Sequence, residues 1–142
     1  MQVQTYLFFE GRCEEALEFY KRELGAEVTA LMRYNEAPKP AEGEQQGDCQ
    51  LPPGSDNKIM HCSFKVGDTT LLASDGRCSG HASFQGFSVA ITAPDIGEAE
   101  RLFAALSKGG QVQMPMAETF FASRFGMAAD PFGVSWMVLA GK

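Results

Sequence analysis

The sequence contains only two histidines, His61 and His81, and no C-x-x-C motif. Cys78 and His81 have a zinc-like spacing, but a structural zinc site closes with four ligands and no second pair completes this one. The cysteines also lack the pattern of a secreted disulfide framework. We therefore expect free thiols that act mostly as small buried apolar side chains, at Cys13, Cys49, Cys62 and Cys78.

Long apolar runs and basic clusters are also missing. No run approaches the roughly 18–20 residues that span a bilayer, and the first residues, MQVQTYLFFEG, lack the basic start and apolar centre of a secretory signal. The 12 Lys and Arg residues stand against 18 Asp and Glu, which gives a net charge of −6. This balance repels phosphate backbones. We expect a cytoplasmic protein that uses neither a membrane nor a nucleic acid as a partner.

The 142 residues, 44% of them hydrophobic, suffice for a core in one domain or in two small halves that share it. Helical spacing of apolar residues predicts helices at 13–24, closed by Gly25, and at 96–108, started by Asp95 and Glu98 in a capping-box pattern. Runs rich in β-branched and aromatic residues predict strands at 3–9, 27–34, 59–66, 69–75, 87–93, 111–118, 122–129 and 134–140.

Turn residues connect these elements. Gly67-Asp68 predicts a two-residue hairpin, and the stretch from Asp130 to Gly133 predicts a type I turn before the last strand. Proline, glycine and acidic residues fill the segment 35–58, which predicts a long surface loop. Such a loop is either a connector or a functional lid, and the sequence leaves both open.

The order strand, helix, strand, strand, strand occurs twice, with an offset of about 83 residues that places Tyr6 over Val89 and Tyr20 over Phe103. We predict an α+β fold of two βαβββ modules, at about 1–80 and 85–142 of a single domain. Side by side, in one chain or across a dimer, they would form a curved, mostly antiparallel, eight-stranded incomplete barrel around a cleft.

The doubled unit and three motifs resemble the vicinal oxygen chelate superfamily, the fold of glyoxalase I, extradiol dioxygenases and fosfomycin- and bleomycin-resistance proteins. The motifs are F-x-G-x-x-E-E-A-L-E-F-Y at 9–20, MHCSFKVGDTTLLASD at 60–75 and DPFGVSW at 130–136. They are similar to the PhnB-like branch, often labelled 3-demethylubiquinone 3-methyltransferase. The resemblance implies a homodimer. No Gly-x-Gly run for a methyl donor occurs, so the residues do not support the label.

The resemblance also implies where a metal would be bound, at the first and last strands of each module. The corresponding residues are Thr5, a position from Ala73 to Asp75, Ser88 and Met137. Of these only Asp75 could bind a divalent cation strongly. We therefore expect no metal site and no other cofactor. A one-residue shift in register would reverse the face of each side chain, but the neighbours Tyr6, Val89, Trp136 and Val138 are no better ligands.

His61 is the candidate for acid–base chemistry. On the strand 59–66 it alternates with an apolar face formed by Met60, Cys62 and Phe64, so we expect it to point to the opposite face, toward the cleft. Asp75, which ends the adjoining strand, could orient the imidazole. Each also has a plain structural interpretation: a hydrogen-bonded strand histidine, and a turn former in Ser74-Asp75-Gly76.

Further residues could line a ligand pocket. Arg33 and Arg124 could fix an anionic ligand or only pair with surface glutamates. Phe125 and Trp136 could form apolar walls or fill the core. With them we expect the strand residues Thr5, Ser88 and Met137 in the pocket.

The leading hypothesis is a glyoxalase-like protein that binds a small organic molecule in its cleft without the superfamily's usual metal. It would be either a binding protein or a metal-independent enzyme that uses His61. The alternative is a metal-dependent lyase, isomerase or dioxygenase with displaced ligands such as His61 and Asp75. A third hypothesis is a structural or interaction protein without a pocket.

Overall fold

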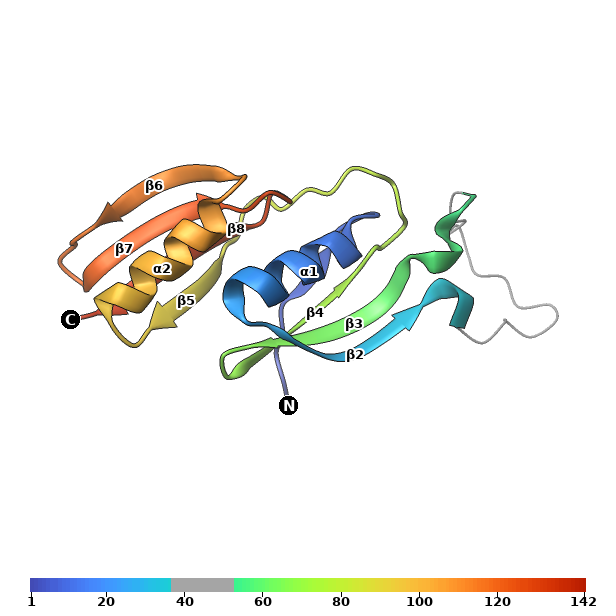
Figure 1. The fold of residues 1–142 in the computed structure, drawn as a ribbon, viewed down its shortest axis with the longest axis horizontal. Coiled ribbons are helices and arrows are strands. Elements are labelled where there is room, and N and C mark those ends of the chain that lie inside the picture. The colour runs from blue at the N-terminus through green and yellow to red at the C-terminus, as the bar shows by residue number, and fades with distance from the viewer. Residues whose placement is uncertain (37–52) are drawn as a thin grey trace. The chain divides into compact units, whose positions relative to one another are not determined.

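In the computed structural model, which describes residues 1–36 and 53–142, the chain forms two compact units, Met1–Ala82 and Ser83–Lys142. Each contains one helix and a four-stranded sheet in the order βαβββ (Figure 1). The predicted fold class is therefore confirmed as α+β with two βαβββ modules. Across these described ranges, no helix has the length and apolar character needed to cross a membrane.

The first unit consists of β1 (Tyr6–Phe8), α1 (Cys13–Leu24), β2 (Glu27–Arg33), β3 (Ile59–Val66) and β4 (Thr69–Ser74). Its sheet has the order β1-β4-β3-β2, and only the β1–β4 pair is parallel. The helix packs on one face of this sheet, since Tyr20 of α1 stacks on Phe64 of β3 with ring centroids 5.7 Å apart.

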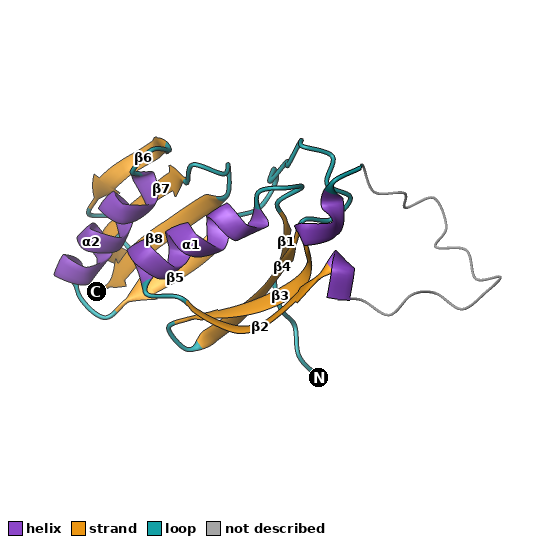
Figure 2. Ribbon diagram, turned by 45° about the vertical axis from the view of Figure 1, so that its right-hand side comes forward, coloured by secondary structure: helices purple, strands orange, loops and turns teal. Residues whose placement is uncertain are grey.

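The second unit repeats the plan with β5 (Val89–Ala93), α2 (Ile96–Ser107), β6 (Gln111–Ala117), β7 (Ala122–Ala129) and β8 (Ser135–Gly141). The sheet order is β5-β8-β7-β6, again with one parallel pair, β5–β8. Figure 2 shows the helix and sheet layers of each unit by colour. The close fit of α2 requires a glycine, because a Cβ on Gly126 would lie 3.0 Å from Cε2 of Phe103.

Most predicted boundaries agree with the structure to within two residues, but the first strand covers only Tyr6–Phe8 of the predicted 3–9. Gly25 ends α1 in the left-handed conformation, with φ of 67°. Asp95 caps α2 by accepting a 2.8 Å hydrogen bond from the amide of Glu98. At the two ends of the predicted loop 35–58, the structure has short 3-10 turns at Tyr34–Glu36 and Ser55–Asn57. Residues 37–52 lie outside the described part, so the prediction of a connector or a lid is not tested.

Two cysteines have the expected environment. Cys13 and Cys62 are both fully buried between α1 and β3, with their sulfur atoms 3.8 Å apart. The hydrogen bond with Cys62, together with burial, raises the pKa of the Cys13 thiol. Cys78 is a free thiol of intermediate burial, and Cys49 lies outside the described residues.

The 83-residue offset holds for the helices, which begin at Cys13 and Ile96, but it is wrong by one residue in the first strands. Tyr6 faces away from α1, because its hydroxyl lies 3.0 Å from Nδ1 of His61. Val89 instead pairs in parallel with Trp136, which is fully buried on the helix side of its sheet. The two units therefore differ by one residue in the connection between first strand and helix.

This slip changes the implied ligand positions. Thr5 precedes Tyr6 and does not hold the place in the first unit that Ser88 holds in the second. Ala73 is fully buried and pairs with Cys62 on the face toward α1, whereas Met137 lies on the face of its sheet opposite α2. A one-residue change of register reverses the face of a strand residue, which explains the difference between Thr5 and Ser88. Ser74, also within the implied range, follows Ala73 and therefore points to the face opposite α1.

A buried aspartate organises the turn before β8. Asp130 is 3% exposed, and its backbone oxygen accepts a 3.0 Å hydrogen bond from the amide of Gly133, as in the predicted type I turn. One carboxylate oxygen accepts hydrogen bonds from the amides of Phe132 and Val134, and the other accepts a 2.9 Å bond from Nε1 of Trp136. Three donors therefore converge on one side chain.

We expect Asp130→Asn to lower the free energy of unfolding by about 2–3 kcal/mol, because the amide replaces an acceptor oxygen with a donor that faces other donors. Urea unfolding followed by the fluorescence of Trp136, the single tryptophan, measures this change. Asp95→Asn is the matched control, expected to stay within about 0.5 kcal/mol because asparagine caps helices as well as aspartate does. Equal effects of the two substitutions would contradict the role given to Asp130.

Candidate functional site

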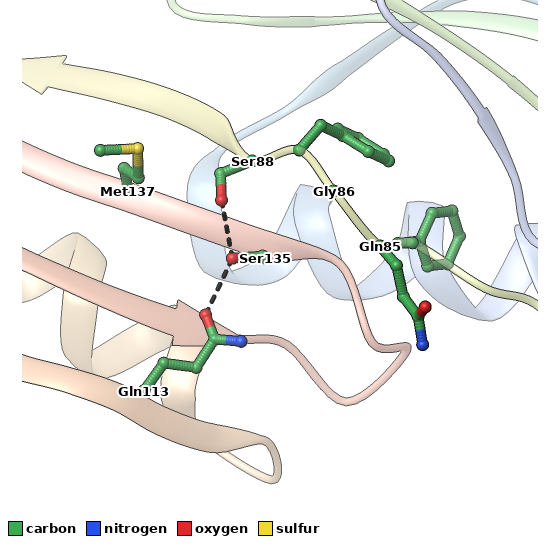
Figure 3. Close-up of a pocket in the computed structure, with 8 residues that line it drawn as sticks. Gln85, Gly86, Ser88, Gln113, Ser135 and Met137 are labelled. Atoms are coloured by element: carbon green, nitrogen blue, oxygen red, sulfur yellow. Dashed lines mark hydrogen bonds between the residues drawn. The ribbon is translucent and has the colours of Figure 1, made fainter.

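A shallow, widely open pocket of about 550 Å³ lies in the second unit. Two strands, β6 and β8, and the segment before β5 supply its lining, which consists of Phe84, Gln85, Gly86, Phe87, Ser88, Gln113, Ser135 and Met137 (Figure 3). None of these side chains carries a charge. The volume lies in the range of small-molecule sites.

Local geometry explains why β8 contributes to this pocket. The bond from Trp136 to Asp130 holds the indole on the buried side of β8. Because successive strand residues point to opposite faces, Ser135 and Met137 then face the pocket. Gly86, with φ of 82°, turns the preceding segment in a conformation that other residues rarely adopt.

Three polar side chains form a hydrogen-bond chain across the pocket (Figure 3). The hydroxyl of Ser135 donates to Oε1 of Gln113 at 2.8 Å. The hydroxyl oxygens of Ser88 and Ser135 are 2.8 Å apart. Because Ser135 has one hydroxyl hydrogen and gives it to Gln113, Ser88 is the donor in the second bond.

Of the residues expected in the ligand pocket, Ser88 and Met137 lie together here. The sequence reasoning did not identify Gln113 or Ser135. Ser135 could have been found from strand alternation, since it is two residues before Met137. Gln113 carried no such signal, because its partner is on another strand and only the sheet order brings the two together.

Other expected pocket residues of the second unit have structural partners. Trp136 fills the core rather than a pocket wall, because its indole is fully buried and bonded to Asp130. Arg124 pairs with Glu100 at 3.4 Å, and Phe125 packs against Phe121 with ring centroids 5.2 Å apart. These contacts agree with the plain structural interpretation of each residue.

The remaining candidates belong to the first unit. Arg33 pairs with Glu14 and donates to the backbone oxygen of Asn57 at 2.6 Å. The backbone oxygen of Thr5 accepts a 2.9 Å bond from the amide of Leu72. Arg33 therefore pairs with a surface glutamate, as one of the two interpretations of its sequence position expected.

Asp75 does not orient His61. Its carboxylate, 1% exposed, accepts hydrogen bonds from the amides of Gly11, Cys13 and Ile59 at 2.9, 2.8 and 2.7 Å. It therefore ties the start of α1 to the edge of β3, on the helix side of the sheet. His61 lies on the opposite face, where its partner is the hydroxyl of Tyr6. The sequence showed that the two strands adjoin, but it did not reveal that the side chains of Asp75 and His61 point to opposite faces of the sheet.

We expect Asp75→Asn to lower the free energy of unfolding by about 2–4 kcal/mol, since one oxygen that accepts buried amides becomes a donor. His61→Asn should cost less than about 1 kcal/mol, because it removes a single partly exposed hydrogen bond. Urea unfolding followed by far-ultraviolet circular dichroism compares the two. An Asp75→Asn protein as stable as wild type would show that the carboxylate is available for other chemistry.

The donor set around the pocket does not fit the superfamily's metal. Hydroxyls, two amides and a thioether stand where a divalent transition metal would require imidazole or carboxylate ligands. Among residues 1–36 and 53–142, no group of three or more His, Cys, Asp or Glu side chains is arranged to hold a metal ion.

The two βαβββ units define a glyoxalase-like fold, and the comparisons with known proteins agree. The crystal structure of a glyoxalase-related enzyme from Fulvimarina pelagi covers 99% of this chain and 88% of its own, with 18% identity and a TM-score of 0.59. At this identity the likeness shows the fold alone.

Closer similarities identify the family. Residues 1–139 match the family described as 3-demethylubiquinone-9 3-methyltransferase. Protein YjdN of Escherichia coli (strain K12) is 34% identical over 141 residues, 97% of this chain and 94% of YjdN. The crystal structure of protein PA1353 from Pseudomonas aeruginosa is 37% identical with a TM-score of 0.81, over 99% of this chain and 98% of PA1353. The chain belongs to this family.

Proposed function

We propose that the protein binds a small organic molecule in the pocket of its second unit, with its own side chains and without a metal ion. The observation that carries this proposal is the chain from Ser88 through Ser135 to Gln113, beside Met137. Hydroxyl and amide groups that converge in a pocket of this size are suited to orient a ligand by hydrogen bonds.

The metal-dependent alternative has less support. It requires His61 and Asp75 to converge on one cation, yet the carboxylate of Asp75 is occupied by three backbone amides on the helix side of its sheet. A carboxylate that leaves these amides would leave buried donors unsatisfied, which is costly. Methyl transfer, which the family description names, likewise lacks a glycine-rich loop for a donor in the sequence.

A second candidate function is proton transfer by His61. The 3.0 Å contact between the Tyr6 hydroxyl and Nδ1 fixes one side of the ring, which leaves Nε2 as the atom that would exchange a proton with a substrate. Under this proposal the protein would be a metal-independent enzyme rather than a binding protein. The proposal also includes a cytoplasmic homodimer; the dimer is what the superfamily resemblance implies.

Metal analysis of protein purified without chelators tests the absence of a metal. We expect substoichiometric zinc, iron, nickel and manganese, and equal metal contents in wild type and His61→Ala, because the imidazole would not be a ligand. Stoichiometric metal that is lost in His61→Ala would instead favour the metal-dependent alternative.

A thermal-shift screen of a small-molecule library against the full chain tests ligand binding itself, since a ligand that binds only the folded state raises its melting temperature. Hits should stabilise wild type and lose their effect in Ser88→Ala, which removes one end of the hydrogen-bond chain. A library without stabilising compounds, or hits unaffected by Ser88→Ala, would contradict the proposed pocket.

A further inference from the structure

The lining of the pocket also restricts the chemistry of its ligand, an inference that rests on the proposed function. We propose that the ligand is an uncharged planar compound that carries a carbonyl oxygen and a hydroxyl or N–H group. The carbonyl oxygen accepts from Nε2 of Gln113, and the hydroxyl or N–H donates to Oγ of Ser88.

The charge of the ligand follows from the lining. The side chains that line the pocket include no lysine, arginine or histidine to neutralise a carboxylate or phosphate, and no acid to neutralise a cation. Transfer of an unpaired charge from water to such a surface is unfavourable. The net charge of −6 opposes anions further.

The hydrogen-bonding groups follow from a count of donors and acceptors in the chain of Ser88, Ser135 and Gln113; Gln85, the other amide of the lining, lies outside this chain. Within the chain, Ser88 donates to Ser135, and Ser135 donates to Oε1 of Gln113. No described residue bonds Nε2 of Gln113, which keeps two hydrogens for a ligand acceptor. The oxygen of Ser88 keeps its lone pairs for a ligand donor. The two ends of the chain therefore differ in polarity.

The planar shape follows from the apolar part of the lining. The rings of Phe84 and Phe87 lie with centroids 6.5 Å apart and an interplanar angle of 72°. Phe87 remains 43% exposed. A flat ring can stack on one such ring while its edge meets the other. The thioether of Met137 adds a polarisable contact at the same pocket.

A matched pair of probes tests this inference on the full chain. 4-Hydroxyacetophenone has the required hydroxyl and carbonyl and no charge, whereas 4-hydroxybenzoate has the same ring and hydroxyl with a carboxylate that is ionised at pH 7. Titrations followed by amide chemical shifts in NMR spectra give both affinity and location. We expect the neutral probe to shift amides of the pocket and to bind at least about tenfold more tightly than the anion.

Gln113→Glu tests the role of the amide. The carboxylate still accepts from Ser135 but offers no donor, so binding of the neutral probe should weaken about tenfold, the size of one lost hydrogen bond. Gln111→Glu is the matched control: it adds the same charge on the same strand, outside the lining, and should leave binding unchanged. Both glutamines are exposed, so folding should not be affected.

The outcomes separate this inference from the proposed function. Equal or tighter binding of 4-hydroxybenzoate at the pocket amides would overturn the inference but leave ligand binding in place. Shifts confined to amides outside the pocket, equal effects of the two glutamate variants, or no shifts with either probe would also overturn it. If the thermal-shift screen yields no ligand either, the proposed function fails as well.

Discussion

The buried carboxylate of Asp130 determines which side chains of β8 face the pocket. It accepts hydrogen bonds from Phe132 and Val134 in the turn and from the indole of Trp136. With Trp136 fixed in the core, strand alternation leaves Ser135 and Met137 no other direction than the pocket. Asp75 is the corresponding buried carboxylate of the first unit. It accepts hydrogen bonds from backbone amides of α1, of β3 and of the segment between β1 and α1. In both units a buried aspartate therefore stabilises the fold, and its carboxylate oxygens are already engaged in hydrogen bonds within the protein.

The chemistry of the pocket differs from that of the metal sites found in metal-dependent proteins of the vicinal oxygen chelate superfamily, which the sequence motifs resemble. A metal would polarise substrate oxygens as a Lewis acid, and this needs carboxylates and imidazoles that converge on a cation. Here the carboxylates of Asp75 and Asp130 stabilise backbone turns and helix starts, and neutral groups remain at the pocket. Under the proposed function, this neutral hydrogen-bond chain would orient a ligand by directional donors and acceptors rather than by charge.

The sequence predicted elements whose signals are local. The helix at Cys13–Leu24 and the strands Ile59–Val66 and Ala122–Ala129 appear as expected, because periodicity and turn residues are set by neighbours in the chain. The predicted alignment of the two first strands was wrong by one residue. The offset of 83 residues aligns the helices, but the connections between first strand and helix differ in length by one residue. The structural role of Asp75 was also missed, because the amides that donate hydrogen bonds to its carboxylate belong to segments distant in sequence.

Pocket residues were only partly predictable for a related reason. Met137 and Ser88 could be proposed from motifs. Gln113 enters the site through its side-chain hydrogen bond with Ser135, although β7 lies between their strands, β6 and β8, in the sheet. Arg33 and Arg124 could have bound an anion, and only their positions beside Glu14 and Glu100 decide between ligand and ion pair. Such long-range pairings depend on packing rather than on spacing.

The most direct test of the central claim is a crystal structure of protein purified from cells without chelators, combined with anomalous scattering at transition-metal absorption edges. The account predicts electron density of an organic molecule within hydrogen-bond distance of Ser88 and Gln113, with no anomalous peak in the pocket. An anomalous peak coordinated by protein side chains, or a pocket that holds only water when crystals are soaked with compounds that raise the melting temperature, would contradict it.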